Sequence, residues 1–498
     1  MERLQLPAAI TAAVLLASAA TAQDIVRIAS PNPVTTLDPI RSAAAGNIEA
    51  FGQLYARLLR RDETGALQPA LAESWAVSDD GLTYTFELRA AKFSDGSPLT
   101  AEDVAFSLNR VAKDPESAYP AAYAALSEVV AVDADTVELR LEYPAAPMLD
   151  YMEIFNAGIV SKADVDARGA DAFAASPLSS GPFMVQEWRP NDRLILAANP
   201  NYWREGYPLV AGAELIEVSD SNARASMILA GEVEAVRAVP YAQVAEVDAA
   251  DDVAVPLEPS TVIYVVLPNH TKPPFDDADV RRAAAMALDR QAIAKAISLG
   301  MAKAANSTLP EALAFYAADL EGQPYDPAAA RAILEEKGLV GTEIVMLAPP
   351  DSAQLMTLLK AQWDAVGFMT KAEPVDTGLW WDRLVGGDYN ITASWWYNET
   401  MDPDLAARWA LCGSCGNNSY YTNYNNPRVD ELTEAALREL DPEKRGAMYR
   451  EIQEITVSEV SQVPLWYAPF TNAYSSRIEG LRLTPALQWT LEETRFTK

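Results

Sequence analysis

The sequence predicts an α/β protein with mixed sheets, folded as two or more lobes. The chain has 498 residues, which exceeds what one hydrophobic core usually supports. Half of the residues are apolar, and this argues against global disorder. Strand-like and helix-like stretches interleave along the chain, an order that favours helices packed on sheets.

Strands are predicted where apolar residues alternate with polar ones. After a short strand at Ile25 to Ile28, the clearest alternation runs from Leu82 to Leu88, following a turn at Asp79-Asp80-Gly81. Thr136 to Leu141 repeats the pattern. Apolar residues from Ile48 to Leu59 instead follow helical spacing, so we expect a helix over that stretch.

Helix starts are marked by capping residues. Thr100 followed by Asp103 is a capping-box pattern. Three further pairs place a capping residue before a proline at the first helical position, namely Asp326-Pro327, Asn426-Pro427 and Asp441-Pro442. Gly338 is expected to end the first of these three helices, because glycine readily adopts the left-handed conformation of a helix C-terminus.

The net charge excludes several classes of partner. With 39 basic and 70 acidic residues, the formal charge is -31. Nucleic acids and anionic membranes need a basic face, so neither is expected as a partner. The acidic residues are spread along the whole chain, and we interpret the charge chiefly as a contribution to solubility.

The N-terminal 22 residues have the pattern of a secretory signal peptide. Arg3 precedes an apolar run from Ala8 to Ala20, and Ala20-Thr21-Ala22 fits a small-residue cleavage site before Gln23. The run is too short to indicate a membrane-spanning helix. No cysteine lies near the cleavage site, so we expect an exported, soluble protein without a lipid anchor, located in a bacterial periplasm.

The region from Pro69 to Arg110 carries a long composite motif. It contains Trp75, the strand Tyr84-Thr85-Phe86 ending in Leu88-Arg89, then Lys92-Phe93, Asp95-Gly96 and Asp103-Val104. This region resembles the signature of the large solute-binding proteins of ABC importers, in the dipeptide- and oligopeptide-binding family (bacterial extracellular solute-binding proteins, family 5). Further matches to the family occur at Gly181-Pro182-Phe183, at Asn199 to Trp203, at Val280 to Ala283 and at Pro427 to Asp430.

The resemblance implies a class II periplasmic-binding-protein fold of the large peptide-binding type. Such a fold has two lobes, two hinge strands and an extra subdomain in lobe 1. We expect the hinge strands near Val262 to Leu267 and Pro469 to Tyr474. The expected division is a signal peptide at 1–22, a discontinuous lobe 1 at 23–53, 183–261 and 475–498, an additional subdomain of lobe 1 at 54–182, and lobe 2 at 262–474.

The segment from Ser394 to Asp404 combines aromatic and acidic residues. Trp395, Trp396 and Tyr397 precede Glu399, Asp402 and Asp404. Aromatic rings offer flat contact faces and exclude water, and a carboxylate beside them attracts a cation more strongly. The segment is consistent with a site for an ammonium or guanidinium group, and equally with a core strand that leads into a loop whose acidic residues face water.

The resemblance assigns roles within this segment. In peptide-binding relatives a tryptophan is followed three residues later by an aspartate that pairs with the ligand ammonium. That register places Glu399 three residues after Trp396. Glu399 is therefore the expected anchor, and the expected ligand contacts beside it are Trp395, Trp396, Tyr397 and Asn398. Asp402 and Pro403 are expected to form a structural turn. Some relatives place an arginine for the ligand carboxylate where this chain has Ala393.

Two other segments complete the expected site. In the family, the loop after the first strand pairs its backbone with the ligand, which implies Asn32, Val34 and Thr35 as contacts. Trp380 and Trp381 are neighbours on a segment interpreted as extended, where adjacent side chains point to opposite sides. We therefore expect one of them in the core and one facing the ligand, and we assign Trp380 to the site.

Enzyme chemistry has one candidate motif. Cys412 and Cys415 form a Cys-x-x-Cys pair, which suits thiol–disulfide exchange when it opens a helix. The polar residues that follow, from Gly416 to Tyr420, instead favour a structural disulfide. His270 is the only histidine, so neither a metal site nor a Ser-His-Asp hydrolase is expected, and no phosphate-binding loop or cofactor motif is present.

The sequence therefore predicts a receptor without enzymatic activity, cofactor or metal. It would act as a monomer that captures a short peptide or related amino compound between its lobes and delivers it to ABC transporter permease subunits in the inner membrane. Three alternatives remain open, namely an exported thiol oxidoreductase that uses Cys412 and Cys415, the same fold with a sugar or other non-peptide ligand, and a binding module that reports to a sensor.

Overall fold

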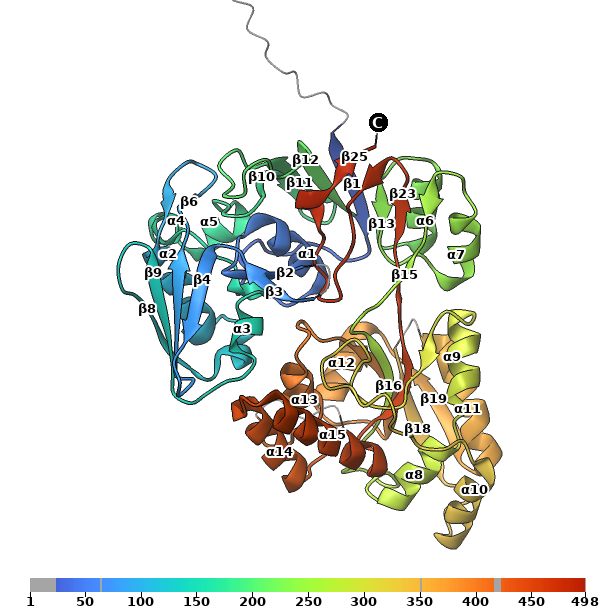
Figure 1. The fold of residues 1–498 in the computed structure, drawn as a ribbon. Coiled ribbons are helices and arrows are strands. Elements are labelled where there is room, and N and C mark those ends of the chain that lie inside the picture. Colours follow the sequence, from blue (N-terminus) through green and yellow to red (C-terminus); the bar gives the residue numbers. More distant parts are fainter. Residues whose placement is uncertain (1–23, 63–64, 350–351, 416–421, 498) are drawn as a thin grey trace, which may run out of the picture.

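The computed structural model describes residues 24–62, 65–349, 352–415 and 422–497. Figure 1 shows two bodies built around separate large sheets, with a third, smaller sheet beside the upper one. The predicted α/β class with mixed sheets is confirmed. The predicted signal peptide and the residues from Gly416 to Tyr420 lie outside the described residues.

The upper body contains a seven-stranded sheet. Strands β1 and β12 are parallel, and so are β1 and β13, whereas the other pairings are antiparallel. In sheet order the strands are β10 (Phe183–Arg189), β11 (Arg193–Ala198), β12 (Gly212–Glu217), β1 (Ile25–Ser30), β13 (Ala235–Val236), β23 (Ala473–Ser475) and β14 (Val253–Ala254). The accompanying helices are α1 (Ala45–Leu54), α6 (Ser221–Leu229) and α7 (Tyr241–Asp248).

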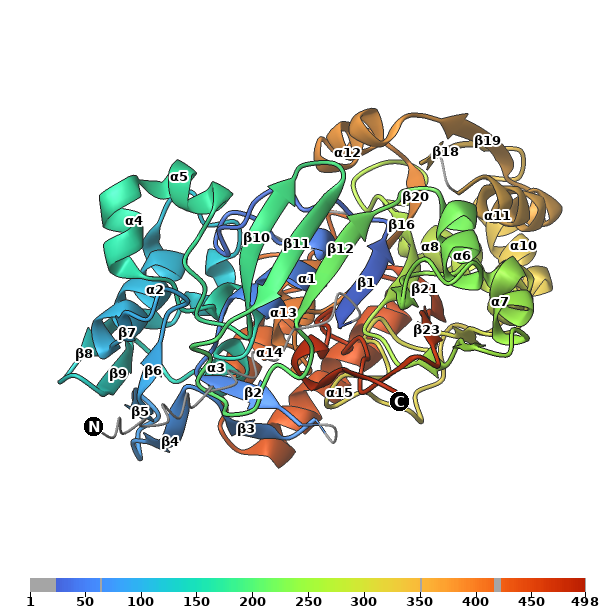
Figure 2. The same cartoon turned by 90° about the horizontal axis from the view of Figure 1, so that it is seen from above.

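The smaller sheet lies beside the seven-stranded sheet, on the side away from helices α6 and α7 (Figure 2). Its strands are β4 (Ala72–Val77), β5 (Thr83–Leu88), β9 (Thr136–Leu141) and β8 (Leu126–Ala131), in that order. Smaller elements here are β2 (Leu59–Arg61), β3 (Leu67–Pro69), β6 (Ala91–Lys92), β7 (Pro98–Leu99), α2 (Ala101–Lys113), α3 (Met148–Tyr151), α4 (Lys162–Arg168), α5 (Ala170–Ala175) and two 3-10 turns at Pro120–Tyr123 and Phe155–Ala157.

The lower body is built on a six-stranded mixed sheet (Figure 1). In sheet order its strands are β17 (Lys303–Ala304), β21 (Val463–Tyr467), β16 (Ile263–Pro268), β20 (Ile391–Trp396), β18 (Glu343–Ala348) and β19 (Met369–Pro374). Its helices are α8 (Ala278–Met286), α9 (Arg290–Ser298), α10 (Pro327–Glu336), α11 (Ala353–Val366), α12 (Thr377–Val385), α13 (Asp404–Ala410), α14 (Pro427–Arg438) and α15 (Pro442–Ser458).

Two short paired strands connect the upper and lower bodies. Strand β15 (Leu257–Glu258) pairs antiparallel with β22 (Phe470–Thr471), and both run between the two large sheets in Figure 1. The first crossing was expected at Val262 to Leu267, but β16 occupies those residues inside the six-stranded sheet. The crossing therefore lies several residues earlier. The chain ends with β24 (Ile478–Glu479), a 3-10 turn at Leu491–Glu493 and β25 (Arg495–Phe496), back in the upper body.

The four helices with predicted capping residues begin where these residues indicate. The side chains of Asp326, Asn426 and Asp441 each accept backbone N–H groups at the start of α10, α14 and α15. The Asp103 carboxylate accepts hydrogen bonds of 2.9 Å from both the N–H and the hydroxyl of Thr100. The helix expected over Ile48 to Leu59 is shorter, because α1 ends at Leu54 and β2 begins at Leu59.

Candidate functional site

The end of strand β20 sends its aromatic residues to two different sides. Trp396 is 4% exposed, packs edge-on against Trp409 and donates from Nε1 to Gln462 Oε1 at 3.3 Å. Trp395 is 51% exposed and stacks on Tyr397 with ring centroids 6.1 Å apart. The two-residue period of a strand explains this division. Trp396 therefore belongs to the core of the lower body, whereas Trp395 and Tyr397 share the other face.

Tyr397 and Glu399 contact the other parts of the molecule. The Tyr397 hydroxyl donates to the backbone oxygen of Ala43, just before α1, at 3.0 Å. The hydroxyl of Tyr119, beside the four-stranded sheet, donates to Glu399 Oε2 at 2.6 Å. This short stretch thus touches both the seven-stranded and the four-stranded parts. The parts of the molecule built on the three sheets therefore meet at Tyr397 and Glu399.

Glu399 is half-buried, and its carboxyl group accepts the Tyr119 hydroxyl. Burial raises its pKa to about 7, although the hydrogen bond from Tyr119 acts in the opposite direction. The pKa of Tyr119 is raised well above its ordinary value, by burial first and then by the Glu399 charge. At mildly acidic pH a carboxyl group with this pKa is mostly neutral, and a nearby cation favours its ionised form.

The rest of the segment folds into a tight turn. The Asn398 side chain is buried, and its Nδ2 donates to the backbone oxygens of Thr400 and Asp402 at 2.8 and 2.7 Å. Asp402 forms a two-nitrogen ion pair with the buried Arg445 and accepts the N–H of Asp404 at 2.9 Å. Pro403 follows as the residue before α13. The side-chain contacts of Asn398 and Asp402 are internal to the lower body.

Asp404 makes a second contact between tyrosine and carboxylate. The Tyr151 hydroxyl, from α3, donates to Asp404 Oδ2 at 2.7 Å. Burial raises the Asp404 pKa to about 6. In addition, Leu405 and Leu437 of the lower body are buried in the hydrophobic core of the four-stranded sheet. The four-stranded part is thus held against the lower body by both polar and apolar contacts.

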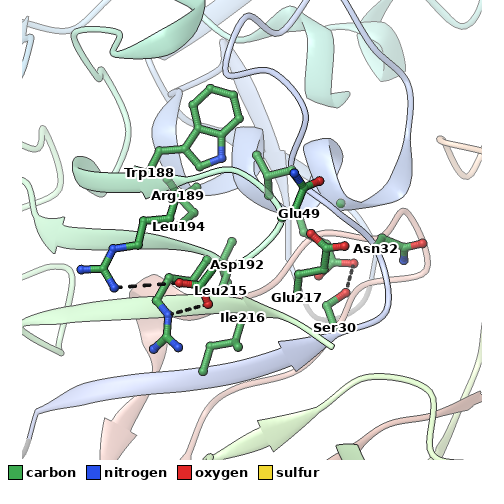
Figure 3. Close-up of a pocket in the computed structure, with 14 residues that line it drawn as sticks. Ser30, Asn32, Glu49, Trp188, Arg189, Asp192, Leu194, Leu215, Ile216 and Glu217 are labelled. Carbon is green, nitrogen blue, oxygen red and sulfur yellow. Dashed lines mark hydrogen bonds and ion pairs between the residues drawn. The ribbon is translucent and has the colours of Figure 1, made fainter. Parts of the chain in front are cut away.

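The loop after β1 lies against helix α1. Asn32 and Val34 are half-buried and line a pocket together with Glu49 and Glu217. Figure 3 labels Asn32, Glu49 and Glu217 at this pocket. A Cβ atom at Gly46 would lie 2.3 Å from the Pro33 backbone oxygen, so only glycine allows this approach. Thr35 is exposed, its N–H donates to Asn47 Oδ1 at 2.7 Å, and its hydroxyl accepts from Asn47 Nδ2 at 2.9 Å.

Trp380 and Trp381 lie on a helix and not on an extended segment. The sequence interpretation was wrong here, because Asp376 caps helix α12 through a 3.0 Å bond from the Leu379 N–H. Trp380 is 9% exposed and donates from Nε1 to Thr392 Oγ1 at 3.0 Å, which places it against the six-stranded sheet. Trp381 is 44% exposed. Trp380 therefore occupies a core position.

Arg237 was not singled out by the sequence, although it lies near the expected site. It directly follows β13, and its Nη1 contacts Glu49 Oε1. Glu49 also accepts from Trp489 Nε1 at 3.0 Å and from the Ser30 hydroxyl at 3.3 Å. Strands β1, β12 and β13 are parallel, so their carboxyl ends lie at one edge of the sheet. In open α/β sheets this edge is where ligands bind, and that rule is the signal that identifies Arg237.

Comparison with known proteins identifies the family. The pattern of the bacterial extracellular solute-binding proteins, family 5 Middle, matches residues 66–418. The chain belongs to this family. It is 28% identical over 496 residues to the glutathione-binding protein GsiB of Escherichia coli O1:K1, which covers 97% of this chain and 96% of the relative.

Solved structures of similar proteins share the fold of this family member. The mannopinic acid complex of MoaA from A. tumefaciens R10 has a TM-score of 0.83 at 26% identity, covering 96% of this chain and 100% of that chain. The periplasmic binding protein DppA of Helicobacter pylori, in complex with the peptide STSA, has a TM-score of 0.82 at 23% identity, covering 94% and 98%. The predicted recognition is confirmed, and the protein is a solute-binding protein of an ABC transporter.

Cys412 and Cys415 of this solute-binding protein form a disulfide. Cys412 is fully buried, and the N–H groups of Gly413 and Ser414 donate to the Asp430 carboxylate at 2.8 and 3.0 Å. These contacts fix the loop against α14. Neither the geometry nor the family comparison supports the thiol oxidoreductase alternative.

Two features of the described residues bear on other functions. Among them, no helix is both long and apolar enough to cross a membrane. Nor do the described residues contain a group of three or more His, Cys, Asp or Glu side chains that could hold a metal ion. His270, the only histidine of the chain, is partly buried. It packs edge-on against Tyr424, its Nε2 lies 3.2 Å from the Ser461 backbone oxygen, and burial lowers its pKa to about 3.

Proposed function

We propose that this solute-binding protein captures a short peptide or a related amino compound, with Glu399 as the partner of its ammonium group. The observation that supports this most is the position of Glu399, a residue of the lower body that accepts the Tyr119 hydroxyl and whose pKa is raised to about 7 by burial. A carboxyl group that is costly to ionise in the empty site gains most when a cation arrives.

The names of the relatives agree with an amino compound. GsiB is named for glutathione, and the DppA complex contains the peptide STSA. Both ligands carry an ammonium group and at least one carboxylate. An amino compound would replace the Tyr119 hydroxyl as the partner of Glu399, while the exposed ring of Trp395 would cover its side chain.

We further propose how the protein works. The upper body with its four-stranded subdomain, and the lower body, would act as the two lobes, with β15 and β22 as the hinge strands. Closure around a ligand is the characteristic motion of such proteins. The loaded monomer would act in the periplasm and hand its ligand to the permease subunits of an ABC importer, without catalysing a reaction itself.

Mass spectrometry of the native protein tests this proposal. The freshly purified protein is introduced intact into the mass spectrometer, and its bound compound is released. The mass of the released compound is then compared before and after acetylation of its amines. We expect a small ligand that gains acetyl groups, as a primary amine does. A ligand that does not react, such as a neutral sugar, would contradict the amino-compound proposal. A compound that binds equally well after reduction and alkylation of Cys412 and Cys415 would confirm that the disulfide takes no part.

A further inference from the structure

We infer that Arg237 receives a carboxylate of the ligand, so that the preferred ligand is a zwitterion held between Arg237 and Glu399. The inference rests on the proposed function and makes its ligand class more specific. It also identifies a positive group to hold an acid, at a site where position 393 offers only alanine.

The first support is the position of Arg237 in the fold. It follows β13 at the edge where the parallel strands β12, β1 and β13 all end. The loop with Asn32 and Val34 begins at the same edge, directly after β1. Helix α1 links this edge to the lower body, because it carries Glu49, the partner of Arg237, and follows Ala43, which accepts the Tyr397 hydroxyl.

The second support is the unused hydrogen-bonding capacity of the guanidinium group. The Arg237 side chain is only 11% exposed. Within the described residues, the one hydrogen bond of this side chain runs from Nη1 to Glu49. Arginine has five N–H donors in a planar fork, which suits a carboxylate that binds through two oxygens. Glu49 in turn is held by Trp489 and Ser30, so the carboxylate beside Arg237 is fixed in place.

The third support is a rigid backbone at this position. Arg224 is 3% exposed and donates from Nε to the Arg237 backbone oxygen at 3.0 Å and from Nη2 to that of Ala238 at 3.1 Å. Ala238 has a φ of 55°, which is costly for alanine and must be held by its surroundings. The buried Arg224 thus acts as a positioning residue that fixes the corner carrying Arg237.

The charge of Arg237 also reaches the lower body. It lowers the pKa of Tyr397, whereas the charges of Glu399 and Glu49 raise it, with burial as the largest cause of the overall increase. Arg237 and Glu399 therefore both act on the same phenol from opposite sides of the interface. A ligand lying along Tyr397 would present its ammonium group to Glu399 and its carboxylate to Arg237.

Calorimetric titration with matched peptides tests the inference. The probes are Met-Leu, Ser-Thr-Ser-Ala and glutathione, each as the free acid, as the amide of its C-terminal carboxylate and as the N-acetyl derivative. For the acid that binds best, we expect the amide to bind wild type about 10- to 100-fold more weakly, because a hydrogen-bonded charged pair is lost. The experiment then compares this ratio between variants.

The key variant is the double substitution R237Q/E49Q, which removes both charges together and avoids leaving a buried carboxylate unpaired. In this variant we expect acid and amide to bind equally, with the acid weakened to the level of the amide. E49Q alone keeps Arg237 and should keep the preference for the acid. E336Q, at an exposed position of α10, is the control and should bind like wild type.

The outcomes separate the two proposals. An acid-to-amide ratio that persists in R237Q/E49Q would overturn the role of Arg237. Wild-type binding that is lost on N-acetylation but unaffected by amidation would also overturn it, while leaving the role of Glu399 intact. If wild type binds none of these probes in any form, the proposed function fails, and the assignment of Arg237 fails with it.

Discussion

The Tyr119 hydroxyl donates a 2.6 Å hydrogen bond to Glu399 and so joins the four-stranded subdomain to the lower body. This bond favours the ionised form of Glu399, whereas burial favours the neutral form and has the larger effect. The two residues thus link the contact between the subdomain and the lower body to the protonation of one carboxyl group. An approaching ammonium group would compete with Tyr119 for the same oxygen.

Replacing Tyr119 by phenylalanine should raise the pKa of Glu399 above its value of about 7. The variant removes a donor to the carboxylate and leaves burial unchanged, so ionisation becomes more difficult. The pKa can be measured from the carbon chemical shift of the Glu399 carboxyl group as pH is varied. Y325F, at an exposed tyrosine, is the control. An unchanged or lower pKa in Y119F would show that Tyr119 does not support the charge.

The stability of the ligand-free protein should depend on Glu399 between pH 4.5 and about 7. Its pKa rises from an ordinary 4.5 to about 7 in the folded protein. In this window the folded chain retains the proton and the unfolded chain has released it, so stability falls as pH rises. Relative to E399Q, which cannot ionise, wild type should lose about 1–3 kcal/mol from pH 4.5 to 8. A constant difference between the two proteins in urea unfolding would contradict this.

Ligand binding should have the opposite pH dependence. An ammonium group needs the ionised carboxylate, so the affinity of wild type for a zwitterionic peptide should increase as pH rises from 6 to 8. Titration calorimetry at several pH values measures the trend. In E399Q the trend should disappear, and a trend that survives there must arise from another group.

Substitutions of Trp395 and Trp396 should have different effects, the first on ligand binding and the second on stability. Replacement of the buried Trp396 by alanine should cost about 3–5 kcal/mol of unfolding free energy, because it leaves a cavity in the lower core. Replacement of the exposed Trp395 should change stability by less than about 0.5 kcal/mol and should weaken ligand binding. If W395A binds like wild type, the exposed ring does not cover the ligand.

The Tyr151–Asp404 pair should contribute to stability. Y151F leaves the buried Asp404 Oδ2 without its tyrosine donor and should cost about 1–3 kcal/mol in urea unfolding. D404N restores a neutral group at this position, so Y151F/D404N should recover part of the loss. If Y151F is as stable as wild type, the Tyr151–Asp404 hydrogen bond does not contribute to the free energy of unfolding.

Local patterns predicted much of the fold. The alternation from Leu82 to Leu88 and the caps at Asp326, Asn426 and Asp441 depend on neighbours within a few residues, and the structure has β5 and the three helices there. The segment with Trp380 is a helix and not the predicted extended segment. A short apolar run does not distinguish a helix from a strand, and the helix start depends on the Asp376 cap.

Candidate site residues could be predicted only where they lie together in one segment of the sequence. The proposed anchor Glu399 follows from its register after Trp396, within a single strand and turn. Its partner Tyr119 lies 280 residues away in the chain, and Arg237 lies 188 residues from Glu49. Such pairs are created by the parallel order of β12, β1 and β13 and by the docking of the subdomain, neither of which appears in local spacing.

The most direct test of the central claim is the affinity of wild type and E399Q for the same amino ligand at pH 8, measured by titration calorimetry, with E336Q as the control. The ligand is the compound released from the native protein or the best of the three peptides. We predict that E399Q binds at least about tenfold more weakly, since one charged hydrogen bond is lost, whereas E336Q binds like wild type. Equal affinities of wild type and E399Q would contradict the assignment of Glu399 as the ammonium anchor.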